Sequence, residues 1–263
     1  MKLAAIGSNC IDLYTNIDGR TAFPGGGPVN MAVYTVRLGG KSAYVGPVGD
    51  DEYGMLLRQA AAEKGVDISH LHTEPGKTAV SMVELKNGER VFGEYDEGVL
   101  SNYTLTPEDL DFICTCDVVV CDLWGKVEGR LKDLQARGVK TAFDCATRPE
   151  DPASQTAMPY TDYLFFSATL DMPALRAQMQ AYHDWGPKLV IAMLGRRGSL
   201  CFDGEQFYPF GIVPCKKVVD TMGAGDSYIA GFLFGITQGW SIEESMKKGA
   251  ETAAETLGYF GAW

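Results

Sequence analysis

The sequence lacks long apolar runs and clusters of basic residues. None of its 263 residues lies in a stretch close to the ~20 apolar residues that a membrane-spanning helix needs. Lysine and arginine number 23 against 34 acidic residues, so the formal net charge is −11 and no basic block offsets it. Nucleic acids and anionic membranes are poor partners, because both require phosphate neutralisation. A phosphorylated small molecule is compatible with this charge, since backbone N–H groups bind phosphate without lysine.

Paired cysteine motifs are also missing. The seven cysteines are an odd number with scattered spacing, and no two form a CxxC pair. Several stand inside apolar runs such as DVVVCD, which predicts buried, reduced thiols in a cytoplasmic protein. The first residues, MKLAAIGSNCIDLY, predict a β-strand rather than a signal peptide, because the apolar segment is short and an aspartate follows it.

His70 and His72 are separated by one residue, as a metal-binding pair on a strand would be. No third ligand of the right type stands nearby in the sequence, and zinc sites need at least three protein ligands. We therefore expect the two histidines to lie on an exposed face of a strand and not to bind a metal.

What the sequence does contain is an alternation of apolar runs and helical patterns. Near-continuous Val, Ile and Leu runs predict strands covered on both faces, with helices between them. Predicted strands lie at 3–8, 42–49, 117–124, 139–145, 162–168, 188–194 and 216–219, and predicted helices at 28–38, 52–64, 128–137, 171–185, 224–238 and 241–257. The pattern predicts a single α/β domain, residues 1–263, with a mostly parallel sheet.

Residues 78–98 follow a different rule, because apolar and polar side chains alternate on both sides of Asn87-Gly88. That pair is typical of a type I′ hairpin turn, in which both central residues need positive φ. A second short antiparallel pair, SLCFDG followed by EQFYPF, comes later. The 78–98 hairpin and part of 8–17 are expected to form a small β-excursion that acts as a lid.

The stretch DTMGAGDSYIAGF places a glycine turn at the predicted start of a helix. Gly223, Ala224 and Gly225 allow a tight turn, and their N–H groups, with that of Asp226, would form an anion site at the helix N-terminus. A Walker A loop is excluded because this stretch lacks the lysine that the loop requires. The dinucleotide fingerprint GxGxxG is excluded because Tyr228 occupies the position of its last glycine, which argues against a Rossmann dehydrogenase.

Asp226 has two interpretations on this stretch alone. A carboxylate beside phosphate-binding donors suits a base that takes the proton from a hydroxyl attacking that phosphate. An aspartate in the first turn of a helix also interacts with the helix dipole, which is worth under ~1 kcal/mol. The stretch by itself does not decide between them.

A second group of polar and glycine residues lies far upstream. FPGGGPVN places a glycine run before a helix, with Asn30 in its first turn, and Asp12 follows the first strand region. Carboxylate and amide groups each bond two sugar hydroxyls, and Gly25 and Gly26 permit close approach, so the set suits a polyhydroxyl ligand. A turn and a helix cap would also explain GGGPVN. In MLGRRGSL, Gly195 begins a turn that lines a nucleotide or forms an ordinary hairpin.

The order of these motifs along the chain resembles the ribokinase-like (PfkB) family of carbohydrate kinases. The motifs are Asp12, Gly25-Gly26 with Asn30, VGDDEYG, LGRRG and DTMGAGDSYIAGF. The last stretch matches the C-terminal signature of the family. The resemblance spans the whole chain and implies a three-layer sandwich with a mostly parallel central sheet and a small β-lid. It also implies ATP-dependent phosphorylation of a sugar hydroxyl.

The resemblance assigns residue roles as well. Asp226 would be the general base for the substrate hydroxyl. The other positions carried over are Gly223, Ala224 and Gly225 for the anion hole, Gly195 for ATP, and Asp12, Gly25, Gly26 and Asn30 for the sugar.

One family feature is missing. Many members have Asn-x-x-Glu after the strand corresponding to 162–167, where it serves the metal and the phosphates, but this chain reads FFSATLD. Ser167 and Asp171 are therefore not assigned that role. Mg²⁺ would arrive with ATP and be held largely through water, and the carbonyls near Asp220 and Met222 would help to hold a monovalent cation.

Within the family, VDISHLHT, RVFGEYDEGV and YFGAW are most similar to members that phosphorylate a glycated amino acid, fructoselysine, on its 6-hydroxyl. Glu94, Asp96 and Glu97 would then attract the ammonium of the lysine moiety, although a solvated strand edge also explains them. The alternatives are another sugar or nucleoside kinase, such as a fructokinase, and a sugar-binding sensor without catalysis. A lid of two or three strands is poorly stable alone, which suggests a homodimer through the lid.

Overall fold

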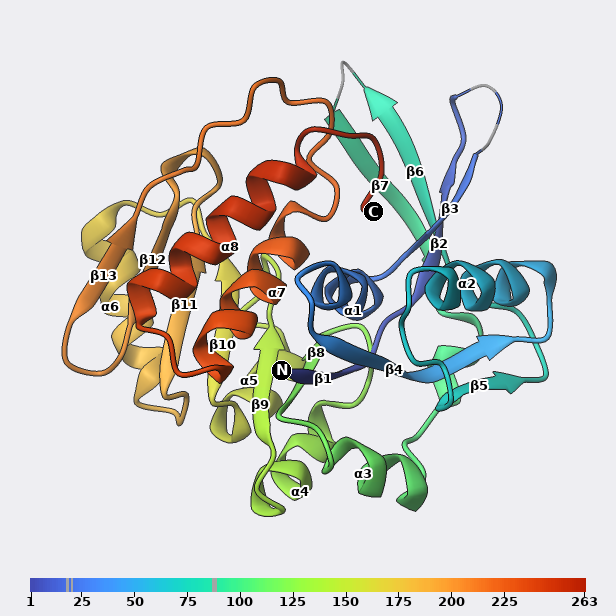
Figure 1. Cartoon of the computed structure of the whole chain (residues 1–263), viewed down its shortest axis with the longest axis horizontal. Helices are drawn as coiled ribbons and strands as arrows, with labels where there is room; N and C mark the ends of the chain where they lie inside the picture. Colours follow the sequence, from blue (N-terminus) through green and yellow to red (C-terminus); the bar gives the residue numbers. More distant parts are fainter. Residues whose placement is uncertain (18, 20, 87–88) are drawn as a thin grey trace.

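The computed structural model describes residues 1–17, 19, 21–86 and 89–263. Within these residues a nine-stranded sheet runs through the middle of the molecule (Figure 1), in the order β13-β12-β11-β10-β9-β8-β1-β4-β5. β12 pairs antiparallel with both neighbours, and the other pairings are parallel. The strands are β1 (Lys2–Ile6), β4 (Lys41–Gly49), β5 (Leu71–Glu74), β8 (Val118–Asp122), β9 (Lys140–Asp144), β10 (Tyr163–Ser167), β11 (Leu189–Met193), β12 (Ser199–Phe202) and β13 (Phe207–Phe210).

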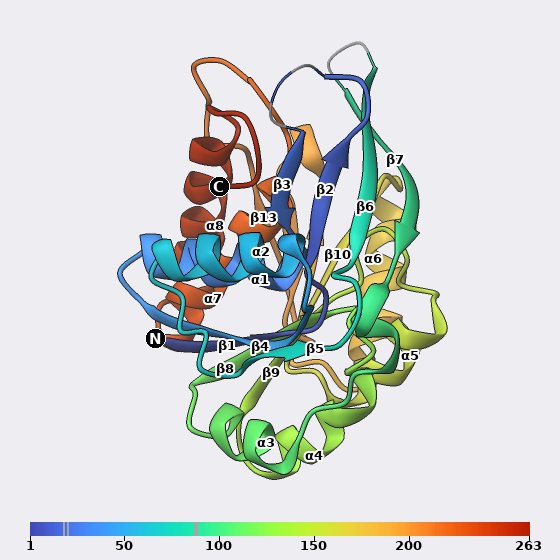
Figure 2. The same cartoon turned by 90° about the vertical axis from the view of Figure 1, so that its right-hand side faces the viewer.

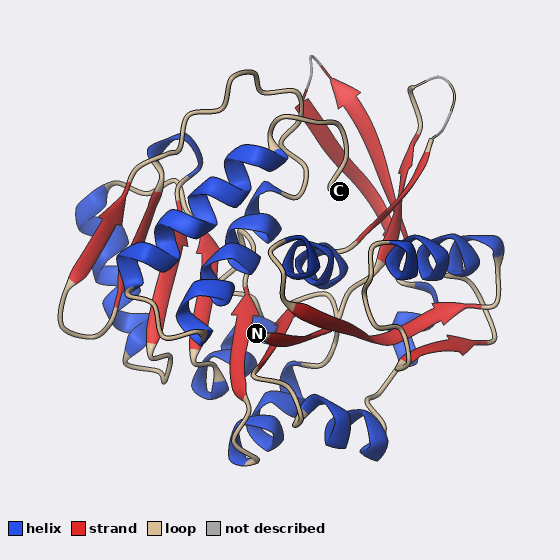
Figure 3. Cartoon of the chain, in the orientation of Figure 1, coloured by secondary structure: helices blue, strands red, loops and turns tan. Residues whose placement is uncertain are grey.

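Helices cover both faces of this sheet (Figure 3). One layer contains α1 (Gly27–Arg37), α2 (Glu52–Glu63), α7 (Ala224–Thr237) and α8 (Ile242–Thr256), and the other contains α3 (Pro107–Ile113), α4 (Leu131–Ala136), α5 (Pro152–Ala157) and α6 (Met172–His183). Successive side chains of a strand point to opposite faces, so Leu3 and Ala5 pack in the first layer and Ala4 and Ile6 in the second. Burial on both faces explains the near-continuous apolar runs of the sequence.

A separate four-stranded sheet, called the lid sheet below, projects beside α1 and α2 (Figure 2). It has the order β3-β2-β6-β7 and consists of β2 (Cys10–Tyr14), β3 (Ala22–Gly25), β6 (Val80–Lys86) and β7 (Glu89–Asp96). β2 pairs antiparallel with β3 and parallel with β6, and β6 pairs antiparallel with β7. The predicted turn at Asn87-Gly88 lies outside the described residues.

The strand predicted at 216–219 was wrong. The chain between β13 and α7 contains no strand, and Val218 and Val219 are 56% and 47% exposed. The N–H of Val219 donates to the carbonyl of Leu257, at the end of α8, at 2.8 Å. Adjacent valines favour a strand only where a neighbouring strand and a core are available, and neither is present here.

The other strands and helices predicted from the sequence overlap observed ones. Residues 128–137 divide into a 3₁₀ turn, Glu128–Arg130, followed by α4. Helices α3 and α5 were not predicted, because seven and six residues are too short to show a helical period clearly.

The seven cysteines are unpaired, as predicted, and five of them are buried. Burial raises the pKa of the Cys121 and Cys145 thiols, which disfavours the reactive thiolate. Among the described residues, no helix is long and apolar enough to cross a membrane.

Candidate active site

The N-terminus of α7 forms an uncapped glycine turn. Gly223 has φ 73°, in the left-handed region, and no side chain caps the helix. The N–H of Ala224 reaches the carbonyl of Thr221 at 3.3 Å. Gly225 lies against the side chain of Met193, because a Cβ at Gly225 would lie 3.8 Å from the Cε of Met193. First-turn N–H groups in this position are available to an anion.

Asp226 lies in this first turn and accepts a hydrogen bond from Nδ2 of Asn30 at 2.6 Å. Loss of solvent around the carboxyl raises the pKa of Asp226 to about 7; the Asn30 bond opposes this, and the charges of Asp122 and Asp12 add to it. A helix dipole alone would lower this pKa, since it favours the anion. A carboxyl whose pKa lies near neutrality suits a group that takes up a proton.

The Asn30 amide is oriented from two sides. Its Nδ2 donates to Asp226, and its Oδ1 accepts the indole N–H of Trp263 at 2.6 Å. An indole nitrogen is only a donor, so Trp263 determines which way the amide faces. One N–H and one lone pair of the amide remain for a ligand. The contribution of Trp263 was not predicted, because its partner lies 233 residues earlier.

Asp12 brings a buried carboxylate to the same region from β2. Gly25 on β3 makes room for it, because a Cβ there would lie 2.5 Å from Oδ2 of Asp12. The next residue, Gly26, has φ 102° and lies very close to Asn9. A Cβ added at Gly26 would lie 2.6 Å from the Cα of Asn9. Burial raises the pKa of Asp12 to about 6, against the opposing effects of the Cys10 hydrogen bond and the Arg90 charge.

Two further carboxylates stand at the ends of the parallel strands β8 and β9, and neither was predicted from the sequence. Asp122 accepts hydrogen bonds from the N–H and the hydroxyl of Ser8, and burial raises its pKa to about 6. Burial, with the nearby charge of Asp226, raises the pKa of Asp144 to about 8. A Cβ at Gly27 would lie 3.4 Å from an oxygen of both Asp122 and Asp226. The sequence did contain a signal for both, because the predicted strands VVVCD and TAFD each end in aspartate. Open α/β sheets bind their ligands at the carboxyl ends of the strands.

An ion pair joins the loop before α7 to the lid sheet. Nε of Arg90, on β7, donates to Oδ1 of Asp220 at 2.8 Å, Nη2 bonds the other oxygen, and both side chains are 6% exposed. Oδ2 of Asp220 also accepts the N–H of Gly261 at 2.7 Å. The guanidinium lies 4.7 Å and 4.9 Å from the ring centroids of Tyr14 and Phe260. The lid sheet, the glycine turn and the last residues of the chain therefore support one another.

Gly195 begins a 3₁₀ turn, Gly195–Arg197, that follows β11. It has φ 56°, and a Cβ there would meet nothing within 4 Å. Asp171, where the family motif is missing, accepts the N–H of Ala174 at 3.0 Å and caps α6. Among the described residues, the carboxylates around Asp226 do not converge on one point as a metal-ligand set would.

Comparison with known proteins identifies the family. The sequence model described as pfkB family carbohydrate kinase matches residues 2–263. The chain belongs to the pfkB family of carbohydrate kinases. It is thus an ATP-dependent carbohydrate kinase, as the resemblance of its motifs implied.

The kinase is 44% identical over 261 residues to fructoselysine 6-kinase of Shigella flexneri, covering 99% of each chain. It is 32% identical to fructosamine kinase FrlD of Bacillus subtilis (strain 168), covering 100% of this chain and 93% of the relative. The structure of Arabidopsis thaliana ribokinase complexed with ribose and ATP superposes with a TM-score of 0.89 at 23% identity, covering 99% of this chain and 93% of the other. The predicted ribokinase-like sandwich is confirmed.

Proposed function

We propose that this kinase transfers the γ-phosphoryl group of ATP to the 6-hydroxyl of fructoselysine, giving fructoselysine 6-phosphate and ADP. The observation that carries the proposal is the 44% identity to a fructoselysine 6-kinase across 99% of both chains. The position of Asp226 between the open helix N-terminus and the Asp12 region agrees with it.

In the proposed reaction Asp226 takes the proton of the 6-hydroxyl while that oxygen bonds to the γ-phosphorus and the bond to the ADP oxygen breaks. Asn30 holds one oxygen of Asp226, which leaves the other for the hydroxyl. The N–H groups of Gly223, Ala224 and Gly225 would face the transferring phosphoryl group. Fixed donors at the site of developing charge supply much of the rate in such reactions.

Asp12, Gly25, Gly26 and Asn30 would hold the sugar. Two buried polar atoms of the same region support this, because Oδ1 of Asn9 and the hydroxyl of Tyr95, on β7, have no hydrogen-bond partner among the residues that the structure describes. Buried polar groups are normally paired, so sugar hydroxyls would satisfy these atoms.

The lysine moiety would lie toward the acidic residues of β7 and the residue after it. Glu97 pairs with Lys126, and Asp96 accepts the N–H of Gly98 at 3.0 Å. Glu94 is exposed on β7. We therefore assign attraction of the substrate ammonium to Glu94 in preference to its two neighbours.

ATP would lie along Gly195, with Mg²⁺ bound to its phosphates. The carbonyls of Asp220 and Met222 would help to hold a monovalent cation, while the Asp220 side chain is engaged by Arg90. Activity measured with and without K⁺ at fixed Mg²⁺ tests the second ion.

Seven unpaired thiols and the use of ATP suit the cytoplasm as the site of the reaction.

The lid sheet would also form a homodimer. Its edge strand β7 exposes Val91 and Phe92, whose residues are 42% and 59% accessible. An exposed edge strand with apolar side chains offers unpaired backbone groups and apolar surface to a second copy.

An ADP-release assay over fructoselysine, fructose, ribose and adenosine tests the function, with NMR of the product to locate the phosphate. We expect the highest kcat/KM with fructoselysine and phosphate on its 6-hydroxyl. A higher kcat/KM with fructose would make the protein a fructokinase. Tight sugar binding without ADP release would make it a sensor.

A further inference from the structure

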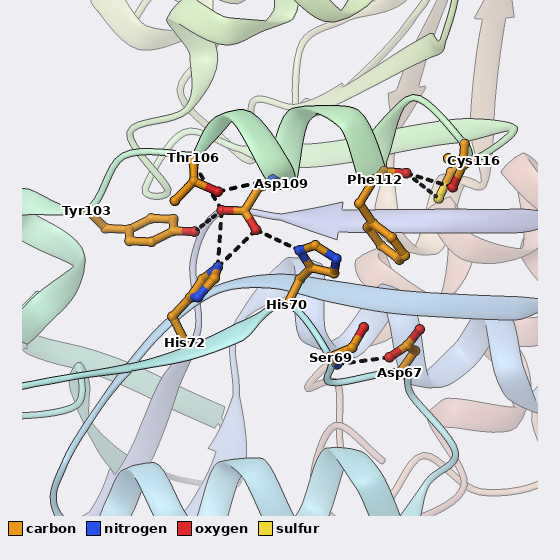
Figure 4. A network of polar contacts seen from close by, with 10 residues as sticks. Asp67, Ser69, His70, His72, Tyr103, Thr106, Asp109, Phe112 and Cys116 are labelled. Carbon is orange, nitrogen blue, oxygen red and sulfur yellow. Dashed lines mark hydrogen bonds and ion pairs between the residues drawn. The ribbon is translucent and has the colours of Figure 1, made fainter.

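Outside the active site, three side chains from two separate segments converge (Figure 4). His70 precedes β5, His72 lies on it, and Asp109 lies in the first turn of α3. Nδ1 of His70 and Nε2 of His72 lie 2.8 Å and 2.9 Å from the same oxygen, Oδ1 of Asp109. The expectation that this histidine pair lacks a third ligand was wrong, because Asp109 comes 37 residues after His72 and approaches only in the fold.

The two oxygens of Asp109 have different surroundings. Oδ2 accepts the hydroxyl of Tyr103 at 2.8 Å and the N–H of Thr106 at 3.0 Å, and Oδ1 faces the two imidazoles. The Asp109 carboxyl is fully buried, and His70, His72, Tyr103 and Thr106 all contact it. Its orientation is therefore set by outer donors, as in many metal sites.

The imidazoles are held in place and still reach solvent. The ring of His70 stacks on Phe112 with 4.1 Å between centroids, and that of His72 lies 5.8 Å from the ring of Tyr103. Their side chains are 21% and 32% exposed. A hollow of about 310 Å³, lined in part by His72, Tyr103 and Thr106, lies beside the cluster.

We propose that His70, His72 and Asp109 bind a zinc-type divalent cation. The ligands would be Nδ1, Nε2 and Oδ1, which lie within 4.8 Å of one another, with water from the hollow as the fourth. Metal bonds of ~2.0–2.1 Å in a tetrahedron place ligand atoms about 3.3 Å apart. The two distances from Oδ1 of Asp109 to the nitrogens, 2.8 Å and 2.9 Å, would widen by a few tenths of an ångström. The two nitrogens, which lie within 4.8 Å of each other, would settle at the same spacing.

Binding has a defined proton balance. A neutral ring that donates to Asp109 must move its one proton to the nitrogen that faces away, so the nitrogen near Asp109 can bind the metal and no proton is released. A doubly protonated ring releases the proton that faces Asp109 to solvent and keeps the other.

The position of the site gives it a structural consequence. β5 leads into lid strand β6, and lid strand β7 leads through the 3₁₀ helix Gly98–Asn102 to Tyr103. Both connections of this hairpin therefore touch the cluster. A bound ion would link the edge of the main sheet to α3 and stiffen the base of the lid, without taking part in phosphoryl transfer.

Calorimetric titration of Zn²⁺ into the full chain, stripped with a chelator and kept in excess Mg²⁺, tests the site. The variants His72→Gln and His70→Asn place an amide N–H near the replaced ring nitrogen, so they keep a donor to Asp109 but lose the imidazole ligand. His183→Gln is the matched control, because His183 is the third histidine of the chain and packs on Phe202.

We expect one equivalent of Zn²⁺ to bind the unmodified protein and His183→Gln, and binding at least tenfold weaker in the other two variants. Zn²⁺ should raise Tm in the first pair only. Absence of binding, or equal binding by all four proteins, would mean that the cluster is a hydrogen-bonded structural feature only. A thiolate-to-cobalt charge-transfer band in the Co²⁺ spectrum would assign the ion to cysteine and also overturn the proposal.

Discussion

At the scale of single residues, the hydrogen bond from Asn30 to Asp226 underlies the proposed chemistry. It occupies one oxygen of a carboxylate that burial and two neighbouring aspartates make hard to ionise. The same environment makes Asp226 a stronger base than a solvated aspartate, because its pKa is raised to about 7. Three experiments test this arrangement.

Replacing Asp226 by asparagine keeps its shape and an oxygen that accepts from Asn30. We expect ADP release to fall by ~10²–10⁴, the usual contribution of a general base. Stability should match that of the unmodified protein below the ordinary aspartate pKa of 3.8, where Asp226 is protonated in both the folded and the unfolded chain. The variant should become progressively more stable than the unmodified protein from there to about pH 7, the raised pKa of the folded state, and keep that advantage at higher pH. ADP release and thermal melts measure the two effects, and Asp151→Asn, which keeps a side chain suited to cap α5, is the control. Retention of a large fraction of activity would remove Asp226 from the role of base.

The pH dependence of kcat/KM follows from the same carboxyl. Its proton must be absent for it to act as a base, so activity should rise with pH and level off above about 7. Below that value the rate should fall by about tenfold for each pH unit. A rate that stays constant across this range, in buffers that keep the substrate and ATP stable, would contradict the assignment.

Trp263 should act by positioning Asn30. The change Trp263→Phe keeps a ring and removes the indole N–H that donates to Oδ1 of Asn30 at 2.6 Å. We expect kcat to fall several-fold with a smaller change in KM, and the pH midpoint to move upward as the Asn30 bond to Asp226 weakens. Trp185→Phe, at an exposed residue, is the control. A loss of thermal stability without a change in the pH profile would reduce Trp263 to a packing role.

At the scale of elements, the contact between β7 and the loop before α7 couples the lid sheet to the anion site. Arg90 and Asp220 are both buried, so their ion pair is screened little by solvent. The Asp220 pKa is lowered despite burial, because Arg90 and the N–H groups of Gly261 and Met222 stabilise its charge.

Arg90→Met should break this coupling while it keeps much of the aliphatic side chain. Removal of one partner of a buried pair leaves an unpaired charge and costs ~3–5 kcal/mol. The two remaining backbone donors to Asp220 place the expected loss at the lower end of that range. Urea unfolding measures the loss, and KM for the sugar should rise with it. Arg148→Met, at a more exposed pair with Asp151, should change neither by much.

The elements also show what a sequence pattern can predict. The runs at 117–124 and 188–194 became β8 and β11, because both faces of each strand are buried and its composition records this. KKVV at 216–219 has similar valines but no neighbouring strand, and it lies exposed between β13 and α7. Local propensity predicts a strand only when the sheet offers a place for it.

At the scale of the whole molecule, the sheet order brings β1, β8 and β9 side by side although β8 begins more than a hundred residues after β1. Asp122 and Asp144 at the ends of β8 and β9 therefore lie near Asp226, whose charge contributes to the raised pKa of Asp144. The lid sheet also presents β7 as an exposed edge, which is the basis of the proposed dimer.

The change Phe92→Glu places a charge on this edge and should separate the proposed dimer. We expect light scattering after size exclusion to give twice the mass of 28.5 kDa for the unmodified protein and that mass for the variant. Met55→Glu, at an exposed apolar residue of α2 outside the lid sheet, is the control. A monomer at all concentrations without the substitution would contradict the dimer.

The sequence by itself determined the fold class, the family and the position of Asp226, because buried strands, helix starts and glycine turns depend on residues adjacent in the chain. Only the tertiary structure brought Trp263 to Asn30, Arg90 to Asp220 and Asp109 to the histidine pair. These partners are 233, 130 and 39 residues apart. Contacts of this kind depend on strand order and helix placement, which no local pattern encodes.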